Sequence, residues 1–166
     1  TFGAVVPRAV WEGGYFWQPF TYMWLHADLL HIAFNMFSLW MFGSTLAMHW
    51  GEQRFLRYYL TCGFGAGFLI ATMTYVAYFL GFAPGSVGIP TLGASGAVYG
   101  VLLALRDLQQ RSVLPWPINI RGVFQPAEET TKGALEMISV GALEGVSAIL
   151  ANHMDPSRRV GKIGLR

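Results

Sequence analysis

The sequence predicts an all-α bundle of transmembrane helices followed by a short soluble α/β fragment at its C-terminal end. The 166 residues are 54% hydrophobic and only 12% charged, whereas soluble domains carry about 25% charged residues. Six of the charged residues lie within 1–105 and fourteen within 106–166. Because the two parts differ so sharply, we expect a membrane domain at 1–105 and a soluble fragment at 106–166.

Two uncharged runs place the helices of the membrane domain. Residues 29–51 contain no Asp, Glu, Lys or Arg, and neither do the 48 residues of 58–105. A helix needs roughly 20 apolar residues to cross a bilayer. The first run therefore fits one crossing, and the second fits two, which the Gly/Pro-rich stretch 81–85 divides. The expected helices are 27–49, 54–80 and 94–110.

The third of these helices is apolar only as far as Leu105, so it is either short or begins below the membrane surface. A start at that depth requires protein or water around the helix end. The alternative to a membrane domain is a soluble protein with hydrophobic core helices, but three such runs in succession favour the membrane.

Aromatic residues crowd the segment before the first helix. Trp and Tyr concentrate at membrane–water interfaces, although a packed aromatic loop is a compatible interpretation. The residues are Trp11, Tyr15, Phe16, Trp17, Phe20, Tyr22 and Trp24.

Arginines flank the loops, with Arg54 and Arg57 beside one and Arg106 and Arg111 beside another. If three helices cross fully, we expect the two pairs on opposite sides of the membrane. The positive-inside rule then assigns no orientation.

Charge and cysteine content exclude several classes of function. A net charge of +2 provides no broad basic face for nucleic acid. The single cysteine, Cys62, excludes an internal disulfide framework and a cysteine-rich zinc site. The start at Thr1 has no signal-peptide pattern and no Met, so we expect the chain to be cut at its N-terminus.

Polar residues within the apolar runs point to a site. His31 and Asn35 are four residues apart and share a helix face, while His26 lies near the helix entry. Polar groups at bilayer depth are costly and face a bundle interior or a water-filled cavity. A lone buried histidine is usually structural, but a His–Asn pair on one face favours function.

Gly93-Ala94-Ser95-Gly96 opens the third helix. Ser95 then lies where free N–H groups and the positive end of the helix suit an oxyanion. The structural alternative is that Ser95 is an N-cap serine. Tyr99 lies one turn below Ser95 on the same face. The pairs Gly96/Gly100 and Gly63/Gly67 would allow close helix contact.

Together these residues resemble the rhomboid intramembrane serine proteases. The resemblance covers about residues 10–105, and its motifs are His26-x4-His31-x3-Asn35, Gly51-Glu52-Gln53-Arg54-Phe55 and Gly93-Ala94-Ser95-Gly96-Ala97-Val98-Tyr99-Gly100. It implies six transmembrane helices around a water-accessible cavity, and protein substrates that are themselves transmembrane segments. It further implies that Ser95 is the nucleophile and that His31, Asn35 and the Ser95 N–H hold the oxyanion. Tyr99 would pack on the general-base histidine.

The resemblance also implies a general-base histidine on a later membrane helix, followed by glycines. Only His153 follows Ser95, in surroundings that lack this pattern. His31 is an alternative base, but it already occupies the oxyanion role. We therefore expect an incomplete rhomboid core without its base and without a first helix, which is inactive or weakly active as it stands.

The C-terminal part resembles the M20-type metallopeptidases and amidohydrolases. The matching stretches are Phe124-Gln125-Pro126-Ala127-Glu128-Glu129, Gly141-Ala142-Leu143-Glu144-Gly145-Val146, His153-x2-Pro156 and 160–166. The resemblance implies a general base at Glu128 and metal ligands at Glu129 and His153, which suit Zn or Mn. Two ligands do not hold a catalytic ion, so first-turn helix acids at Glu128 and Glu129 are the favoured interpretation.

The sequence thus predicts a chimeric or truncated chain, joined near 105–121. The favoured function is that of a rhomboid-type membrane protease without a cofactor, located in a bacterial inner membrane, whose partners are the lipid bilayer and transmembrane substrates. The alternatives are a non-catalytic protein that binds transmembrane segments and a fragment of an M20-type hydrolase. Zn or Mn is expected only if the C-terminal fragment were completed. No nucleic-acid partner is expected.

Overall fold

The computed structural model describes residues 2–82, 85–114 and 137–146, and these are mainly helical. The predicted α-helical class of the membrane domain is confirmed in this part of the chain, which contains no strand beyond a single Val5–Thr91 bridge. In chain order the helices are α1 (Pro7–Trp11), α2 (Gln18–Thr21), the 3-10 helix η1 (Tyr22–Trp24), α3 (Leu29–Ser38), the π-helix η2 (Leu39–Gly43), α4 (Ser44–Trp50), α5 (Glu52–Phe79), the 3-10 helix η3 (Ser86–Gly88) and α6 (Ser95–Gln110).

The first predicted crossing is one helical segment with a change of pitch in its middle. Helices α3, η2 and α4 follow one another without a break from Leu29 to Trp50. This 22-residue segment and the 28-residue α5 are each long and apolar enough to cross a membrane. Their outward side chains are large and exposed, as at Leu29 (82%), Trp40 (70%) and Phe79 (80%). Such faces suit contact with lipid or with further helices.

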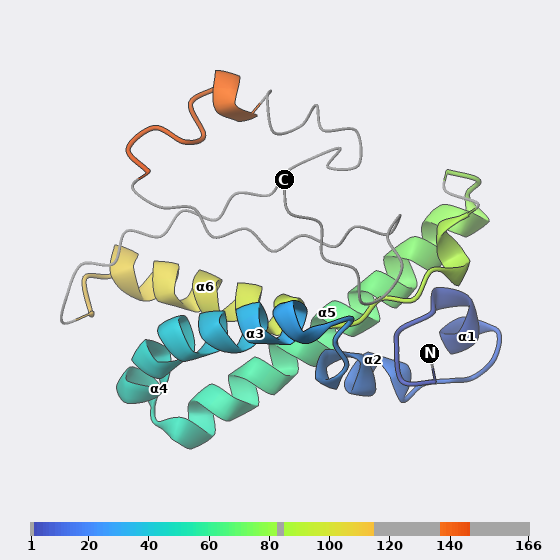
Figure 1. The fold of residues 1–166 in the computed structure, drawn as a ribbon, viewed down its shortest axis with the longest axis horizontal. Coiled ribbons are helices and arrows are strands. Elements are labelled where there is room, and N and C mark those ends of the chain that lie inside the picture. Colours follow the sequence, from blue (N-terminus) through green and yellow to red (C-terminus); the bar gives the residue numbers. More distant parts are fainter. Residues whose placement is uncertain (1, 83–84, 115–136, 147–166) are drawn as a thin grey trace.

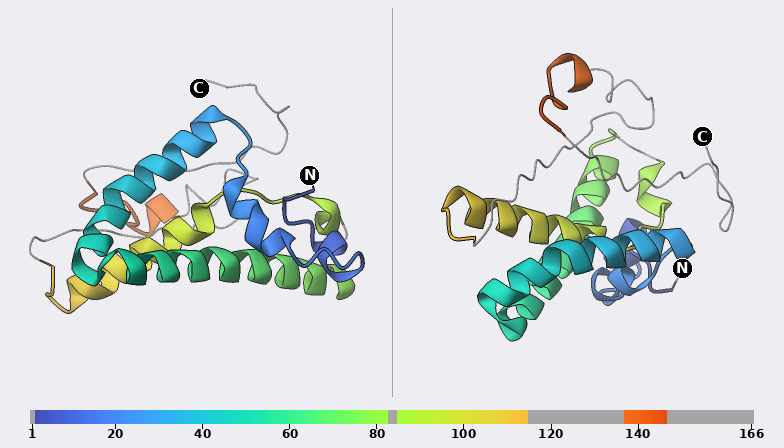
Figure 2. Two further views of the ribbon diagram at one scale, coloured as in Figure 1. Left: turned by 90° about the horizontal axis from the view of Figure 1, so that it is seen from below. Right: turned by 60° about the vertical axis from the view of Figure 1, so that its left-hand side comes forward.

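Helices α5 and α6 are antiparallel and pack through small residues (Figures 1 and 2). A Cβ added at Gly96 would lie 2.5 Å from Ala66 Cβ, and one at Gly100 would lie 2.5 Å from Cys62 Sγ. Tyr58 Oη donates a hydrogen bond to the Gly100 carbonyl at 3.0 Å. The pair Gly96/Gly100 therefore mediates close contact between α6 and α5, whereas Gly63 and Gly67 of α5 make room for Met23 and Tyr22 of η1.

The register of this pair places the start of α6 half-way along α5. Ala66, which faces Gly96, lies fourteen residues after Glu52 and thirteen before Phe79. At 1.5 Å per residue this is about 20 Å from each end of α5. Helix α6 has 16 residues, or about 24 Å, so it is the short helix with a deep start that the sequence allowed.

Antiparallel packing corrects the expected placement of the arginines. As α6 advances from Gly96 to Gly100, its contacts on α5 move back from Ala66 to Cys62. The end of α6 therefore lies beside the start of α5. Arg54 and Arg57 share one end of the bundle with Arg106 and Arg111, and the prediction of opposite sides was wrong. Three consecutive crossings return the chain to the side from which the second one began.

The segment before α3 packs against α5 through buried aromatic residues. Tyr22 is 1% exposed, and its Oη donates a 2.7 Å hydrogen bond to the Gly63 carbonyl. Its ring occupies the space beside Gly67, where an added Cβ would lie 2.5 Å from Tyr22 Cε1. Other aromatics of the segment face outward, including Phe16 (60%) and Trp24 (66%). The packed-loop interpretation thus holds for Tyr22, and the membrane-interface interpretation of the exposed members stays a prediction.

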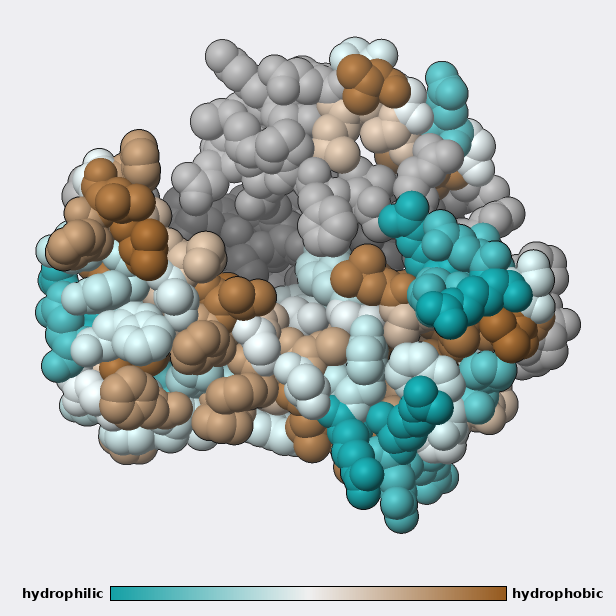
Figure 3. Space-filling view, turned by 180° about the vertical axis from the view of Figure 1, so that it is seen from behind, coloured by the Kyte–Doolittle hydropathy of each residue, from teal (hydrophilic) through white to brown (hydrophobic). Residues whose placement is uncertain are grey.

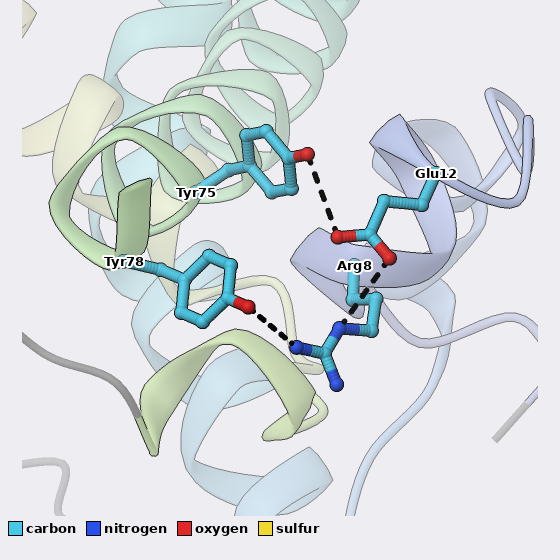
Figure 4. Close-up of polar contacts among 4 residues, drawn as sticks. All are labelled: Arg8, Glu12, Tyr75 and Tyr78. Carbon is cyan, nitrogen blue, oxygen red and sulfur yellow. Dashed lines mark hydrogen bonds and ion pairs between the residues drawn. The ribbon is translucent and has the colours of Figure 1, made fainter. Parts of the chain in front are cut away.

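Polar contacts tie α1 to the far end of α5 (Figure 4). Arg8 Nε lies 3.5 Å from Glu12 Oε2, and an Arg8 Nη donates to Tyr78 Oη at 3.1 Å. Tyr75 Oη donates to Glu12 Oε1 at 3.5 Å. The four side chains form a link at the surface between two segments that are about seventy residues apart.

The predicted soluble α/β fragment lies mostly outside the described residues. Within 137–146 the chain forms one short helical turn at 137–139 and then turns. The strands expected near 121–125 and 146–150, and most of the helix expected at 128–138, fall outside the described part. Glu128, Glu129 and His153 also lie outside it.

Candidate active site

The first turn of α3 is fixed by a capping carboxylate. Asp28 is the N-cap residue, and its Oδ1 accepts a 2.7 Å hydrogen bond from the His31 backbone N–H. An N-cap side chain satisfies one of the orphan donors of a helix start. This bond holds the His31 backbone in place at the beginning of the first membrane-spanning segment.

The His31 imidazole is buried, with one nitrogen held and the other directed at the segment before Ser95. The residue is 7% exposed, and Nδ1 accepts a hydrogen bond from the Ala27 N–H at 3.3 Å. In a neutral ring the proton is then on Nε2. A Cβ added at Gly93 would lie 2.6 Å from Nε2. His31 therefore presents an N–H donor beside Gly93, two residues before Ser95.

Gly93 makes this approach possible. Its φ is +113°, a conformation that favours glycine, and its N–H donates to the Tyr22 carbonyl at 3.0 Å. Any larger residue would collide with the imidazole. The start of α6 is thus held from two sides, by His31 and by the backbone of η1.

Asn35 lies one turn after His31 and is 2% exposed. Its Nδ2 donates a 2.9 Å hydrogen bond to the His31 carbonyl, which fixes the side chain against its own helix. The amide has a second N–H to offer. His31 and Asn35 lie on one buried face of α3, as their spacing of four residues predicts.

Ser95 is the first residue of α6 and is partly exposed. The N-cap residue is Ala94, and no side chain caps this helix end. The interpretation of Ser95 as an N-cap serine was therefore wrong. The first helical N–H groups with a carbonyl partner are those of Ala97 and Val98, so the N–H groups of Ser95 and Gly96 precede the hydrogen-bonded part of the helix.

His26 packs against His31 as an edge-to-face neighbour, with ring centroids 4.9 Å apart. Both ring nitrogens of His26 are buried and have no hydrogen-bond partner among the described residues. Burial lowers the pKa of His26 below its ordinary value, so the ring is neutral near pH 7. The two imidazoles together form a neutral polar cluster.

Tyr99 and the C-terminal residues complete the set taken from the sequence. Tyr99 lies on α6 one turn after Ser95 and is 41% exposed. The described residues contain no group of three or more His, Cys, Asp or Glu side chains that could hold a metal ion. The M20-like ligands Glu129 and His153 lie outside the described residues, so their roles stay predictions.

Two supporting residues were missed at the sequence level. Asp28 could have been found, because an Asp three residues before a buried position at a helix start is a capping pattern. Tyr22 carried no comparable signal, because its contact with Gly63 joins residues forty-one apart.

A family model described as Rhomboid domain matches residues 13–123, which include α2 to α6 and the cluster around Ser95. The chain belongs to the rhomboid family. As a rhomboid-family protein with two helices long enough to cross a membrane, it is a membrane protein.

Curated rhomboid proteins from plants, animals and bacteria are similar to this chain. RHOMBOID-like protein 6 of Arabidopsis thaliana is 35% identical over 103 residues, which are 62% of this chain and 30% of that protein. Rhomboid protease GluP of Bacillus subtilis is 35% identical over 63% of this chain and 18% of its own length. The human presenilin-associated rhomboid-like protein is 39% identical over 48% and 19%. The chain spans less than a third of each.

A second family model, Peptidase family M20/M25/M40, matches residues 87–166 and overlaps the first over 87–123. The predicted resemblance to two families is therefore confirmed. A Rhodococcus jostii protein named as a glutamate–cysteine ligase is 57% identical over 53 residues, which are 31% of this chain and 7% of that protein. No solved structure matches significantly.

Proposed function

We propose that this rhomboid-family chain carries the nucleophile and the oxyanion-binding half of an intramembrane serine protease site. The observation that supports this proposal most is the contact of the His31 ring with Gly93, immediately before Ser95. Ser95 would attack the carbonyl of a peptide bond in a transmembrane segment. Its hydroxyl is not used as a helix cap, so it is available for chemistry.

The oxyanion formed by that attack would meet donors from two helices. The Ser95 N–H precedes the hydrogen-bonded part of α6, and the His31 Nε2–H points to the same segment. Asn35 contributes its second amide N–H from one turn along α3. Fixed donors in a site with little water stabilise developing charge strongly, and the loss of one donor costs about 10²–10³ in rate.

The tautomer of His31 argues against a role as the general base. A base needs an unprotonated nitrogen facing the serine, but Nδ1 is used by the Ala27 N–H and Nε2 carries the proton. His31 therefore acts as a donor. We assign no general base among the described residues, so we propose only slow proton removal from Ser95 in this chain.

The depth of Ser95 supports a substrate that reaches it within the membrane. The start of α6 lies about 20 Å along α5 from either end, and the hydrocarbon core is about 30 Å thick. We propose that the protein lies in a bacterial inner membrane. The arginines at the shared end of α5 and α6 would face the cytoplasm by the positive-inside rule.

Fluorophosphonate labelling of the detergent-solubilised full chain tests the proposal. We expect an adduct on Ser95, located by peptide mass spectrometry. Ser44 is the control, because it lies within the continuous helical segment Leu29–Trp50, where no helix start leaves free N–H groups beside it. Ser95→Ala should abolish labelling and Ser44→Ala should leave it unchanged.

Absence of an adduct on Ser95 would overturn the catalytic proposal and favour a non-catalytic protein that binds transmembrane segments. Equal labelling of Ser95 and Ser44 would show that Ser95 has only the reactivity of an ordinary serine. That result would also overturn the catalytic proposal. The M20-type alternative requires retention of stoichiometric zinc after dialysis, which we do not expect from two ligands.

A further inference from the structure

An open pocket lies at the end of the bundle opposite the start of α6, where α4 turns into α5. It has a volume of about 800 Å³ and is lined by Trp50, Gly51, Glu52, Gln53, Arg54 and Arg57. Gly51 makes the turn with a φ of +83°. Because Trp50 ends one candidate crossing and Glu52 begins the next, the pocket lies at the membrane surface.

The two arginines of the pocket have no carboxylate partner in the described part of the chain. The ion pairs found there are Arg8–Glu12 and Arg111–Asp107. The Arg54 guanidinium lies 5.2 Å from the centre of the Trp50 ring, which leaves its N–H groups available. Glu52 is the only carboxylate among the six lining residues, so the pocket has a net positive charge.

The surrounding surface has the same character. Figure 3 shows strongly hydrophilic groups gathered toward one side of the molecule, over the region where α5 begins and α6 ends. Arg106 and Arg111 belong to this end, since α6 runs antiparallel to α5. Only Arg54 and Arg57, however, line the pocket itself.

We propose that this pocket binds a phosphate group, and that the phosphate is carried by an anionic membrane phospholipid. Guanidinium groups present forked N–H donors that match phosphate oxygens. Trp50 stands at the level of the lipid headgroups, where tryptophan is favoured. Basic pockets at the ends of transmembrane helices attract anionic headgroups. Free phosphate shares this chemistry but gains nothing from the position of the pocket at the bilayer.

Native mass spectrometry of the full chain in dodecyl maltoside micelles tests the proposal. The chain is titrated with palmitoyl-oleoyl phosphatidylglycerol, with the phosphatidylcholine of the same acyl chains, and with inorganic phosphate. We expect retained adducts with phosphatidylglycerol, few with phosphatidylcholine, and no displacement by millimolar phosphate. Displacement by phosphate would overturn the lipid assignment.

A matched pair of double variants separates the pocket from general surface charge. R54Q/R57Q should weaken phosphatidylglycerol binding by roughly 25-fold, because each arginine near a membrane surface contributes about fivefold. R106Q/R111Q removes two arginines from the same end that do not line the pocket, one of which is already paired with Asp107, and should weaken binding clearly less than R54Q/R57Q does. An equal effect of both would show diffuse attraction and overturn the proposal. If R54Q/R57Q does not fold, Arg57→Gln alone should weaken binding about fivefold.

Discussion

The two ends of α6 differ in the kind of polar side chain that lies beside them. Where α6 begins, the polar side chains are neutral and buried, as with His31 at 7% and Asn35 at 2% exposure. Each is held by a backbone group, Ala27 N–H for one and the His31 carbonyl for the other. Where α6 ends, the polar side chains are charged and exposed, among them Arg54, Arg57, Arg106 and Arg111.

The difference shows how a helix bundle in a lipid bilayer can hold polar side chains in its interior. A charge at bilayer depth is very costly, whereas a neutral group with hydrogen-bond partners is tolerated. The buried end therefore depends on close packing and on fixed tautomers. The exposed end carries its charges at the surface, where they stay in contact with water or with lipid headgroups. Substitutions that disturb packing at the start of α6 should therefore lower the free energy of unfolding more than substitutions that remove a charge at its end.

The largest expected effect is that of Gly93→Ala. The added Cβ would lie 2.6 Å from His31 Nε2, at a φ of +113°. Backbone strain and the collision together should lower the free energy of unfolding by about 2–4 kcal/mol and suppress labelling of Ser95. Thermal unfolding in detergent measures the first effect.

Gly65→Ala is the control for that substitution. Nothing lies within 4 Å of a Cβ added there, and alanine is the better helix former, so we expect a gain of about 0.5–1 kcal/mol. If Gly93→Ala were as stable as Gly65→Ala, the contact between His31 and the start of α6 would be wrong.

Gly96→Ala should be the next most damaging. Its Cβ would lie 2.5 Å from Ala66 Cβ, so α5 and α6 would be pushed apart at a cost of about 1–3 kcal/mol. The double variant A66G/G96A moves the methyl group to the other helix and should recover part of the loss. A double variant less stable than the sum of the two single effects would contradict this packing.

Tyr22→Phe should cost about 1 kcal/mol, because it removes the 2.7 Å hydrogen bond to the Gly63 carbonyl. Burial raises the pKa of Tyr22 to about 12, from an ordinary 10.0. The unfolded chain therefore loses this proton first, and stability falls as pH rises from about 10 to 12. Urea titrations across this range should show a steeper fall for the wild type than for the variant.

Arg8→Gln should have the smallest effect. The Arg8–Glu12 pair is about half exposed, with side chains at 50% and 47%, and exposed ion pairs contribute less than about 1 kcal/mol. A loss above about 2 kcal/mol would mean that the link in Figure 4 between α1 and α5 is a major support of the fold.

The positions of the helices could be predicted from the sequence because long uncharged runs have few alternatives. The observed bounds, Leu29–Trp50, Glu52–Phe79 and Ser95–Gln110, lie within two residues of those expected. Helix spacing also placed His31 and Asn35 on one face. These features depend on local periodicity alone.

Contacts between distant segments could not be predicted in the same way. Three contacts depend on how the helices pack. They are those of the His31 ring with Gly93, of Tyr22 with Gly67 and of Gly96 with Ala66. The sequence left open whether Ser95 is an N-cap, because Ala94 and Ser95 differ by one residue. The arginine placement, in contrast, could have been predicted, because three consecutive crossings return the chain to the side from which the second one began.

The pairing of His31 with Ser95 is tested most directly by labelling rates in histidine variants. His31→Ala should slow fluorophosphonate labelling of Ser95 by about 10²-fold, the cost of one oxyanion donor. His49→Ala removes an exposed histidine from α4 and should leave the rate unchanged. A His31→Ala chain that folds and labels as fast as the wild type would show that this imidazole and this hydroxyl do not share a site.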